Sequence, residues 1–103
     1  MKTADPIHPG EHLAEFLEEL EITQYRLAKT IGVHQVRISE VIRGRRSITA
    51  DTALRLGRAF GTTPEYWLNL QRTYDLDVAR AVTDLNLVKP LPTIAQASTL
   101  QNK

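Results

Sequence analysis

The side chains of this chain best suited to chemistry are hydrogen-bonding and basic groups gathered between residues 24 and 46. Glutamine and serine exchange hydrogen bonds with base edges, and arginine donates to guanine and to phosphates. The side chains of this kind are Gln35, Arg37, Ser39, Arg43, Arg45 and Arg46, with the carboxylate of Glu40 among them. Their types and spacing predict recognition of a nucleic acid.

Two short amphipathic helices joined by a tight turn would present these side chains together. Thr23 is a suitable N-cap for a helix at about residues 24–31, and Gly32 supplies the backbone freedom that a sharp turn needs. A second helix is predicted at about Gln35–Arg43, ended by Gly44. The apolar positions that would pack together are Leu27, Ala28, Ile31, Ile38, Val41 and Ile42. This arrangement is a helix-turn-helix, which lays its second helix in the DNA major groove.

Charge is distributed unevenly along the chain, although the formal net charge is only +1. The segment Ile22–Phe60 holds eight basic residues against Glu40 and Asp51, a balance of +6. The preceding segment, Asp5–Glu21, holds six acidic residues and no lysine or arginine, a balance of −6. A protein polarised in this way can neutralise phosphates with one surface and offer the other to a basic partner.

Length and composition restrict the possible classes of protein. A chain of 103 residues is large enough for one small domain with a single core. It contains no cysteine, which excludes a disulfide framework, a thiol nucleophile and a cysteine metal site. The first residues lack the apolar core of a signal peptide, and no apolar run reaches membrane-spanning length. We therefore expect a cytoplasmic protein.

Three further helices are predicted around the helix-turn-helix, which gives an all-α fold of five helices without strands. One begins near Pro9, another follows the cap Thr49 and ends at Gly61, and the last opens at Thr63 and continues towards Val82. The apolar positions expected in the first and fourth helices are Leu13, Phe16, Leu17, Leu20, Ala53, Leu54, Leu56, Ala59 and Phe60.

The predicted organisation has three parts. Residues 1–8 form an N-terminal arm, residues 9–83 form the helix-turn-helix and dimerisation domain, and residues 84–103 form a flexible tail. Beyond Asp84 the helical pattern weakens, prolines interrupt it, and the last residues are small and polar.

Two pairs of residues resemble catalytic or metal sites at first sight. His8 and His12 are four residues apart, but Pro9 lies between them where the helix only begins, and no third ligand stands nearby. Glu18 and Glu19 are neighbours on a helix and point in different directions, so a solvated face is the better interpretation. We expect no enzyme activity, no metal and no cofactor.

Several motifs are similar to those of a known family. The pattern of a phage-repressor-like (Cro/cI, or XRE) helix-turn-helix is matched at Gln24, Leu27, Ala28, Gly32, Ile38 and Gly44. Three longer segments resemble the HigA (VapI-type) antitoxins: HPGEHL at His8–Leu13, RGRRSITADTALRLGRAFGTTPEYWLNLQ at Arg43–Gln71, and YDLDVA at Tyr74–Ala79. The resemblance covers roughly residues 6 to 82.

The resemblance implies a homodimeric DNA-binding antitoxin. Such proteins neutralise a HigB toxin, a RelE-like ribonuclease that cleaves messenger RNA at the ribosome, and repress their shared operon at a palindromic operator. Two alternatives remain open from the sequence. One is a stand-alone XRE-type repressor without a toxin, and the other is a protein-interaction module that no longer uses its DNA face.

The match to the helix-turn-helix pattern also implies individual roles. Gln24 would meet a phosphate, Gln35 would read a base such as adenine, and Val36 would touch a thymine methyl. Arg37 fits either guanine or a phosphate, and Glu40 would accept from cytosine or orient Arg37. The best phosphate candidates after the second helix are Arg43, Arg45 and Arg46.

The remaining assignments concern the start of the second helix, a dimer surface and an acidic surface. His34 is a poor cap and either reaches DNA or has no special role. The fifth helix is the natural dimer surface, with Trp67 packed inside the protomer and Leu70 and Tyr74 nearer the two-fold axis. The acidic side chains that would face a basic toxin are Glu11, Glu15, Glu18 and Glu19.

Overall fold

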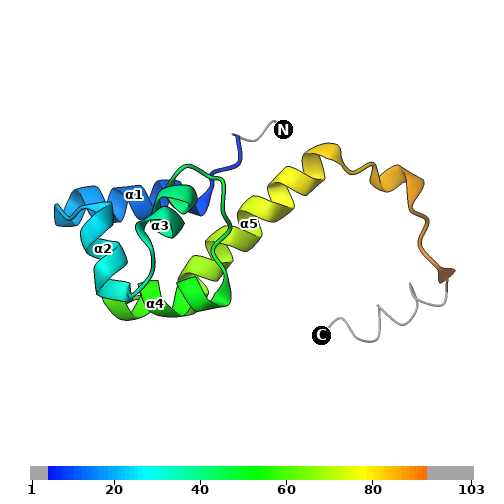
Figure 1. Ribbon diagram of the computed structural model, residues 1–103. Coiled ribbons are helices and arrows are strands. Elements are labelled where there is room, and N and C mark those ends of the chain that lie inside the picture. The colour runs from blue at the N-terminus through cyan, green and yellow to red at the C-terminus, as the bar shows by residue number, and fades with distance from the viewer. Residues whose placement is uncertain (1–4, 93–103) are drawn as a thin grey trace.

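The computed structural model describes residues 5–92, and these residues form five α-helices and no strand (Figure 1). The elements are α1 (Pro9–Leu20), α2 (Gln24–Ile31), α3 (Gln35–Ile42), α4 (Ala50–Phe60), α5 (Pro64–Val82) and the short 3₁₀ helix η1 (Leu85–Leu87). The predicted all-α architecture of five helices is thus confirmed, with α2 and α3 as the helix-turn-helix. α1 and α4 pack against α5, while α2 packs against α3 and α4, and α3 packs against α1 (Figure 1).

Threonine side chains begin three of the helices, as predicted from their positions. The Oγ1 atom of Thr23 accepts from the Arg26 N–H at 3.0 Å, and Thr63 accepts from the Tyr66 N–H at 3.1 Å. Thr49 caps α4 in the same way, at a longer distance of 3.4 Å. His34 precedes α3 without any side-chain cap hydrogen bond, which agrees with imidazole being a poor N-cap here.

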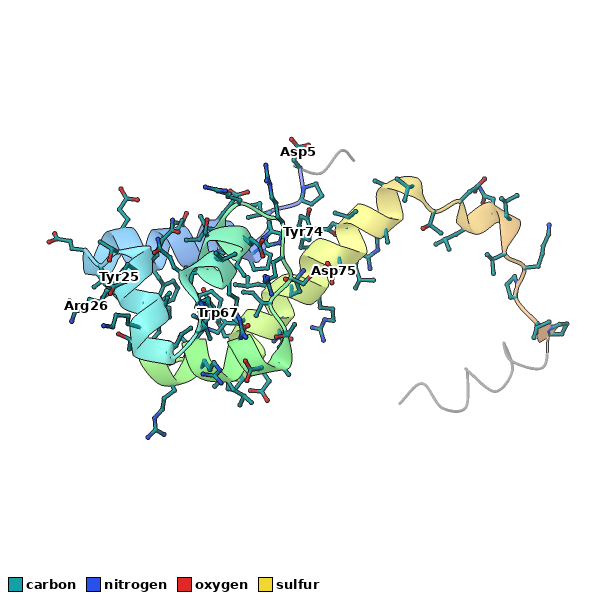
Figure 2. The ribbon with its side chains drawn as sticks, in the orientation of Figure 1. Asp5, Tyr25, Arg26, Trp67, Tyr74 and Asp75 are labelled. Carbon is teal, nitrogen blue, oxygen red and sulfur yellow. The ribbon has the colours of Figure 1, made fainter. Side chains whose placement is uncertain are left out.

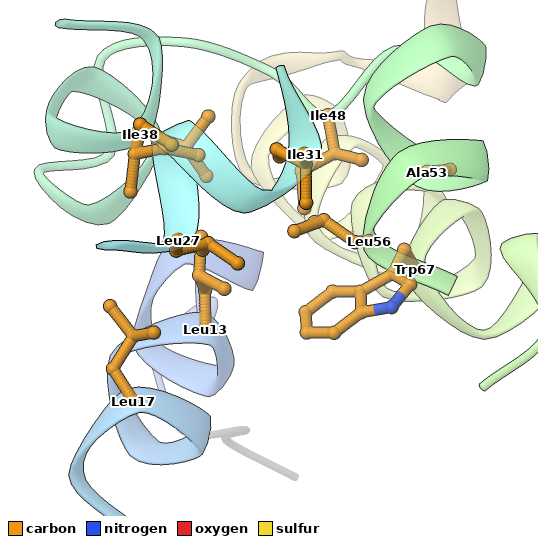
Figure 3. Close-up of a cluster of buried hydrophobic side chains, with 11 residues drawn as sticks. Leu13, Leu17, Leu27, Ile31, Ile38, Ile48, Ala53, Leu56 and Trp67 are labelled. Carbon is orange, nitrogen blue, oxygen red and sulfur yellow. The ribbon is translucent and has the colours of Figure 1, made fainter. Parts of the chain in front are cut away.

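A single apolar core lies between the helices (Figure 3). Trp67 and Leu56 lie beside Ile31 in it, and Trp67 has no exposed surface (Figure 3). The indole Nε1 donates to the Thr62 hydroxyl at 2.8 Å, so this polar atom is satisfied inside the core. The buried apolar residues are Leu13, Leu17, Leu27, Ala28, Ile31, Ile38, Val41, Ile48, Ala53, Leu56 and Trp67.

Three predicted core positions are wrong, because Leu20, Leu54 and Ala59 are exposed. Leu20 is 53% exposed and Leu54 is 60% exposed. Leu20 ends α1, where Glu21 adopts a left-handed conformation (φ 57°) and turns the chain away to α2. Leu54 lies on the outer side of α4, about 100° around the helix from the buried Ala53. A periodic pattern identifies apolar positions, but not whether another helix covers them.

A close approach of backbones fixes α3 against α1. A Cβ atom added to Gly10 would lie 1.9 Å from the Val41 carbonyl oxygen, far inside van der Waals contact. Glycine at this position therefore lets the first turn of α1 rest directly on the end of α3. This contact helps to set the orientation of the helix that carries the DNA-facing residues.

His8 belongs to the folded part of the chain, although the predicted domain boundary placed it in the N-terminal arm. It is 8% exposed, and its Nδ1 accepts from the Gly10 N–H at 2.9 Å, which caps α1. Its ring meets the edge of Tyr74 with centroids 4.8 Å apart. Burial lowers the pKa of His8 below its ordinary value of 6.5, against the opposing effect of Asp75 and Glu11.

The end of α5 leaves the rest of the molecule (Figure 1). All residues from 78 to 92 are exposed, and η1 lies within what the sequence predicted to be a tail. We call residues 76–92 the C-terminal extension and residues 8–75 the body. The prediction of a flexible tail at 84–103 falls partly on residues 93–103, which lie outside the described residues.

Candidate nucleic-acid interface

The exposed face of α3 carries most of the side chains predicted to read DNA. Ile38 and Val41 are completely buried, so the opposite side of this short helix faces outward. Gln35 and Val36 are exposed there, Val36 by 60%, while Ser39 and Glu40 are half-buried. An outward helix face of this size, with amide, hydroxyl and small apolar groups, fits the major groove.

Arg37 points away from this face, contrary to its prediction as a freely projecting reader of guanine or phosphate. Its Nη1 donates to Oδ2 of Asp51 at 2.7 Å and to the Thr52 hydroxyl at 3.3 Å. Both partners belong to the first turn of α4. Arg37 therefore joins α3 to α4, and only part of its guanidinium remains accessible.

Asp51 is the meeting point of three elements of the helix-turn-helix region. Besides Arg37, it accepts from the Nε of Arg55 at 3.0 Å. The Nη1 of Arg55 donates in turn to the carbonyl of Ile31 at 2.6 Å, at the end of α2. Hydrogen bonds from Arg37, and next from Arg55, lower the pKa of the Asp51 carboxyl below its ordinary value. This network was not predicted from the sequence, although the four-residue spacing of Asp51 and Arg55 is a typical ion-pair signal.

Glu40 forms a second ion pair at the far end of α3. Its Oε1 accepts from Nε of Arg46 at 2.8 Å and from Nη2 at 2.5 Å. The alternative prediction that Glu40 orients Arg37 is wrong, because Arg37 donates to Asp51 and Glu40 accepts from Arg46. Arg46, predicted as a phosphate ligand, is held against α3 by this carboxylate.

The remaining candidates surround the exposed face of α3. Arg43 and Arg45 are exposed and take part in no ion pair within residues 5–92. His34 is exposed at the start of α3, and Gln24 is half-buried at the start of α2. In Figure 2 the neighbouring Tyr25 and Arg26 lie on the outer side of α2. The unpaired positive charge near the groove-reading residues thus comes from the loop after α3.

The loop after α3 is anchored to α5 by a residue that the sequence analysis did not single out. Gln71 is 6% exposed, and its Oε1 accepts from the Ile48 N–H at 2.8 Å. Its Nε2 donates to Asp75 at 2.9 Å, so both ends of the amide are used. Its spacing of four residues from the buried Trp67, on the same face of α5, was the available signal. The anchor fixes the path of the segment that carries Arg43, Arg45 and Arg46.

The residues predicted for a dimer interface are only partly available. Trp67 is fully buried inside the protomer, where the sequence analysis placed it, so this residue of α5 offers no surface to a partner. Leu70 and Tyr74 are half-buried on α5, where Figure 2 shows Tyr74 and Asp75 beyond Trp67. Exposed apolar side chains continue along the C-terminal extension: Leu76, Val78, Val82, Leu85, Leu87, Val88 and Leu91.

The predicted toxin-facing carboxylates all lie on the surface of α1. Glu11, Glu15, Glu18 and Glu19 are exposed. Glu15 and Glu19 border an open groove of about 340 Å³ whose apolar lining is Phe16, Leu20 and Phe60. Within residues 5–92 no three histidine, aspartate or glutamate side chains converge as a metal site, and no helix is long and apolar enough to cross a membrane.

Comparison with known proteins agrees with this geometry. The helix-turn-helix family matches residues 13–67. Virulence-associated protein I of Dichelobacter nodosus is 46% identical over 92 residues, covering 87% of this chain and 85% of that protein. A HigA-family addiction module antidote protein from Coxiella burnetii is 47% identical, with a TM-score of 0.80 over 85% of this chain and 100% of the other. The Pseudomonas aeruginosa antitoxin HigA, solved with the higBA promoter, is 40% identical with a TM-score of 0.77, over 84% and 97%.

Proposed function

Because the chain belongs to the HigA family of helix-turn-helix antitoxins, we propose that it binds a palindromic operator as a homodimer and neutralises a HigB/RelE-like toxin. It acts by binding rather than by catalysis, in the cytoplasm. The observation that carries the DNA-binding half is the exposed face of α3, flanked by Arg43 and Arg45, which form no ion pair within residues 5–92. A HigA relative solved with promoter DNA supports the same half.

Within this proposal, Gln35 and Val36 read bases, and Arg43 and Arg45 bind phosphates. Gln35 has the amide geometry for two hydrogen bonds to adenine, and Val36 offers only an apolar contact to a thymine methyl. Gln24 adds its amide to the free N–H groups at the start of α2, where a phosphate is favoured. Ser39, Glu40 and His34 lie at the edges of this set.

Dimerisation follows from the geometry of palindromic sites. Two recognition helices must lie about 34 Å apart to enter successive major grooves. The exposed apolar side chains of the C-terminal extension, together with Leu70 and Tyr74, supply a surface for pairing that the body does not cover. Toxin binding is assigned to the acidic side of α1, because Glu11, Glu15, Glu18 and Glu19 are exposed there and α1 contains no lysine or arginine.

Affinity purification of the tagged protein from its own cells tests the antitoxin half. Recovery of a small basic RelE-like protein in stoichiometric amount, identified by mass, is the expected result. A dimer without a partner, while the neighbouring gene is expressed, would favour a stand-alone repressor instead. If the protein shows no salt-dependent binding to operator DNA, a protein-interaction module is favoured.

Two substitutions test the assignment of base and phosphate contacts. Gln35→Ala is expected to cost about 1–3 kcal/mol on the operator and little on random DNA. Arg45→Ala is expected to weaken binding to all sequences alike and to reduce the salt slope by roughly one unit. If Arg45→Ala instead relaxes the preference at one base position, Arg45 reads a base.

The toxin surface is tested by charge reversal on α1. The double variant Glu15→Lys/Glu18→Lys is expected to lose toxin affinity, because both carboxylates lie on the exposed acidic side of α1. Glu65→Lys, on the exposed first turn of α5, is a matched control. Unchanged toxin affinity in the α1 variant would exclude this surface.

A further inference from the structure

The four arginines near the exposed face of α3 fall into two classes. Arg43 and Arg45 are exposed and in no ion pair within the part of the chain that the structure describes. Arg37 and Arg46 each meet a carboxylate, with nitrogen–oxygen distances of 2.7 Å to Asp51 and 2.5 Å to Glu40. The basic surface therefore has fewer free charges than its arginine count implies.

An arginine in such a pair is a weaker ligand for a phosphate. The carboxylate cancels most of its attraction for DNA, and a phosphate must first displace the carboxylate. Binding of phosphates to free basic groups releases counterions and is the main source of affinity for DNA of any sequence. Each pair therefore removes one sequence-independent contact from the surface.

The two carboxylates lie where their charge also acts on DNA. Glu40 is on the outward part of α3 beside Val36, and Asp51 is in the first turn of α4. Both side chains are partly open to solvent, with 38% of Glu40 and 56% of Asp51 exposed. They fix the direction of both guanidinium groups without burying them.

We propose that Glu40 and Asp51 determine the operator selectivity of this surface, by holding Arg46 and Arg37 in intramolecular ion pairs that prevent indiscriminate phosphate binding. This inference rests on the proposed function, because it assumes that the α3 face binds DNA. Selectivity here comes from suppressing affinity for the wrong sequences as well as from contacts to the right one.

The test compares two DNA probes in the full-length protein. One is a duplex of about 30 base pairs enriched from a random library by the wild-type protein, long enough for two half-sites. The other is a scrambled duplex of equal composition. Glu40→Gln is expected to raise affinity for the scrambled duplex roughly three-fold and to steepen its salt slope by about one unit. Affinity for the enriched duplex changes less, so the ratio of the affinity for the enriched duplex to the affinity for the scrambled duplex falls.

Asp51→Asn is expected to lower the same ratio. Here affinity for the enriched duplex also falls, because Arg37 no longer fixes α3 to α4. Circular dichroism melting of each variant separates this effect from unfolding, since a loss of folded protein lowers binding to both duplexes alike.

Two control variants isolate the role of the pairs. Asp77→Asn makes the same charge change and breaks the Asp77–Arg80 pair of α5, which lies outside the α3 surface. It is expected to leave the ratio unchanged. The double variant Glu40→Gln/Arg46→Gln has the wild-type net charge and is expected to restore the wild-type salt slope.

The inference is overturned if Glu40→Gln and Asp51→Asn leave affinity and salt slope on the scrambled duplex unchanged. It is equally overturned if Asp77→Asn has the same effect, or if the double variant keeps the steeper slope. If the wild-type protein enriches no duplex at all, the proposed DNA-binding function fails, and the inference fails with it.

Discussion

The body and the C-terminal extension contain similar apolar side chains but bury them to different extents. In the body, Trp67, Leu13 and Leu56 are fully buried between helices. In the extension, Val82 and Leu87 are about 80% exposed. The difference does not arise from residue type. It arises because the body folds back on itself through five helices, whereas nothing in residues 5–92 returns to cover the extension.

This contrast distinguishes the apolar surface that one protomer buries by itself from the apolar surface that stays exposed and is available to a partner. The body has a closed core, capped helices and a positioned recognition surface. The extension exposes apolar surface that costs free energy in water until something covers it. A second copy is the occupant that the proposed binding to a palindromic operator requires. The predictions below test this division, beginning with the largest expected effect.

The first prediction compares one large apolar side chain in each region. Trp67→Ala is expected to lower the free energy of unfolding by about 3–5 kcal/mol, because it opens a cavity in the body. Leu87→Ala is expected to change it by less than about 0.5 kcal/mol. Urea denaturation measures the free energy of unfolding of both variants. The protein concentration is chosen so low that further dilution does not change the unfolding midpoint. Similar losses in the two variants would show that the extension is packed in solution.

The second prediction concerns the contact between α1 and α3. Gly10→Ala is expected to cost roughly 1–3 kcal/mol of stability and to weaken operator binding, because a Cβ collides with the Val41 carbonyl. Glu11→Ala, at the next and exposed position, is the control. Thermal melting and a gel-shift assay report the two effects. A fully stable Gly10→Ala protein with wild-type DNA binding would show that α3 does not depend on this contact.

The third prediction uses the buried histidine of the body. Because the pKa of folded His8 is below 6.5, its neutral form stabilises the fold fully above pH 6.5, and this stabilisation is lost as pH falls below it. The midpoint of thermal unfolding is therefore expected to fall between pH 7.5 and 5.5. His8→Asn keeps an acceptor for the Gly10 N–H but does not titrate, so its midpoint is expected to fall less. An equal fall in both proteins would assign the pH dependence to other groups.

The fourth prediction concerns substitutions in the C-terminal extension. They are expected to change the assembly of two protomers and to have the smallest effect on the stability of one protomer. The double variant Val78→Asp/Val82→Asp leaves the body untouched, so its unfolding at high dilution is expected to match wild type. Its dimer is expected to dissociate, because charges replace the exposed apolar ridge that continues from Tyr74. Analytical ultracentrifugation measures the mass. A dimer as stable as wild type would place the two-fold axis elsewhere.

Most of the fold was predictable because its signals are local. Threonine caps, terminal glycines and apolar spacing act within one or two helical turns, and they gave the bounds of α2 and α4 nearly residue for residue. The same local rules failed at Leu20 and Leu54, where burial depends on whether a distant helix arrives. They also could not identify Gly10, whose role appears only when α3 packs onto it.

In the candidate DNA surface, too, some features follow from the local sequence and others only from how the helices pack. The sequence by itself determined that α3 is amphipathic and that Gln35, Val36, Ser39 and Glu40 lie on its open side, because helical periodicity requires it. Only the tertiary structure decided which arginines are free. Arg37 meets Asp51 fourteen residues away, and Gln71 holds Ile48 across twenty-three. Such contacts depend on how helices pack, because side chains far apart in sequence pair only where the fold brings them within hydrogen-bond distance.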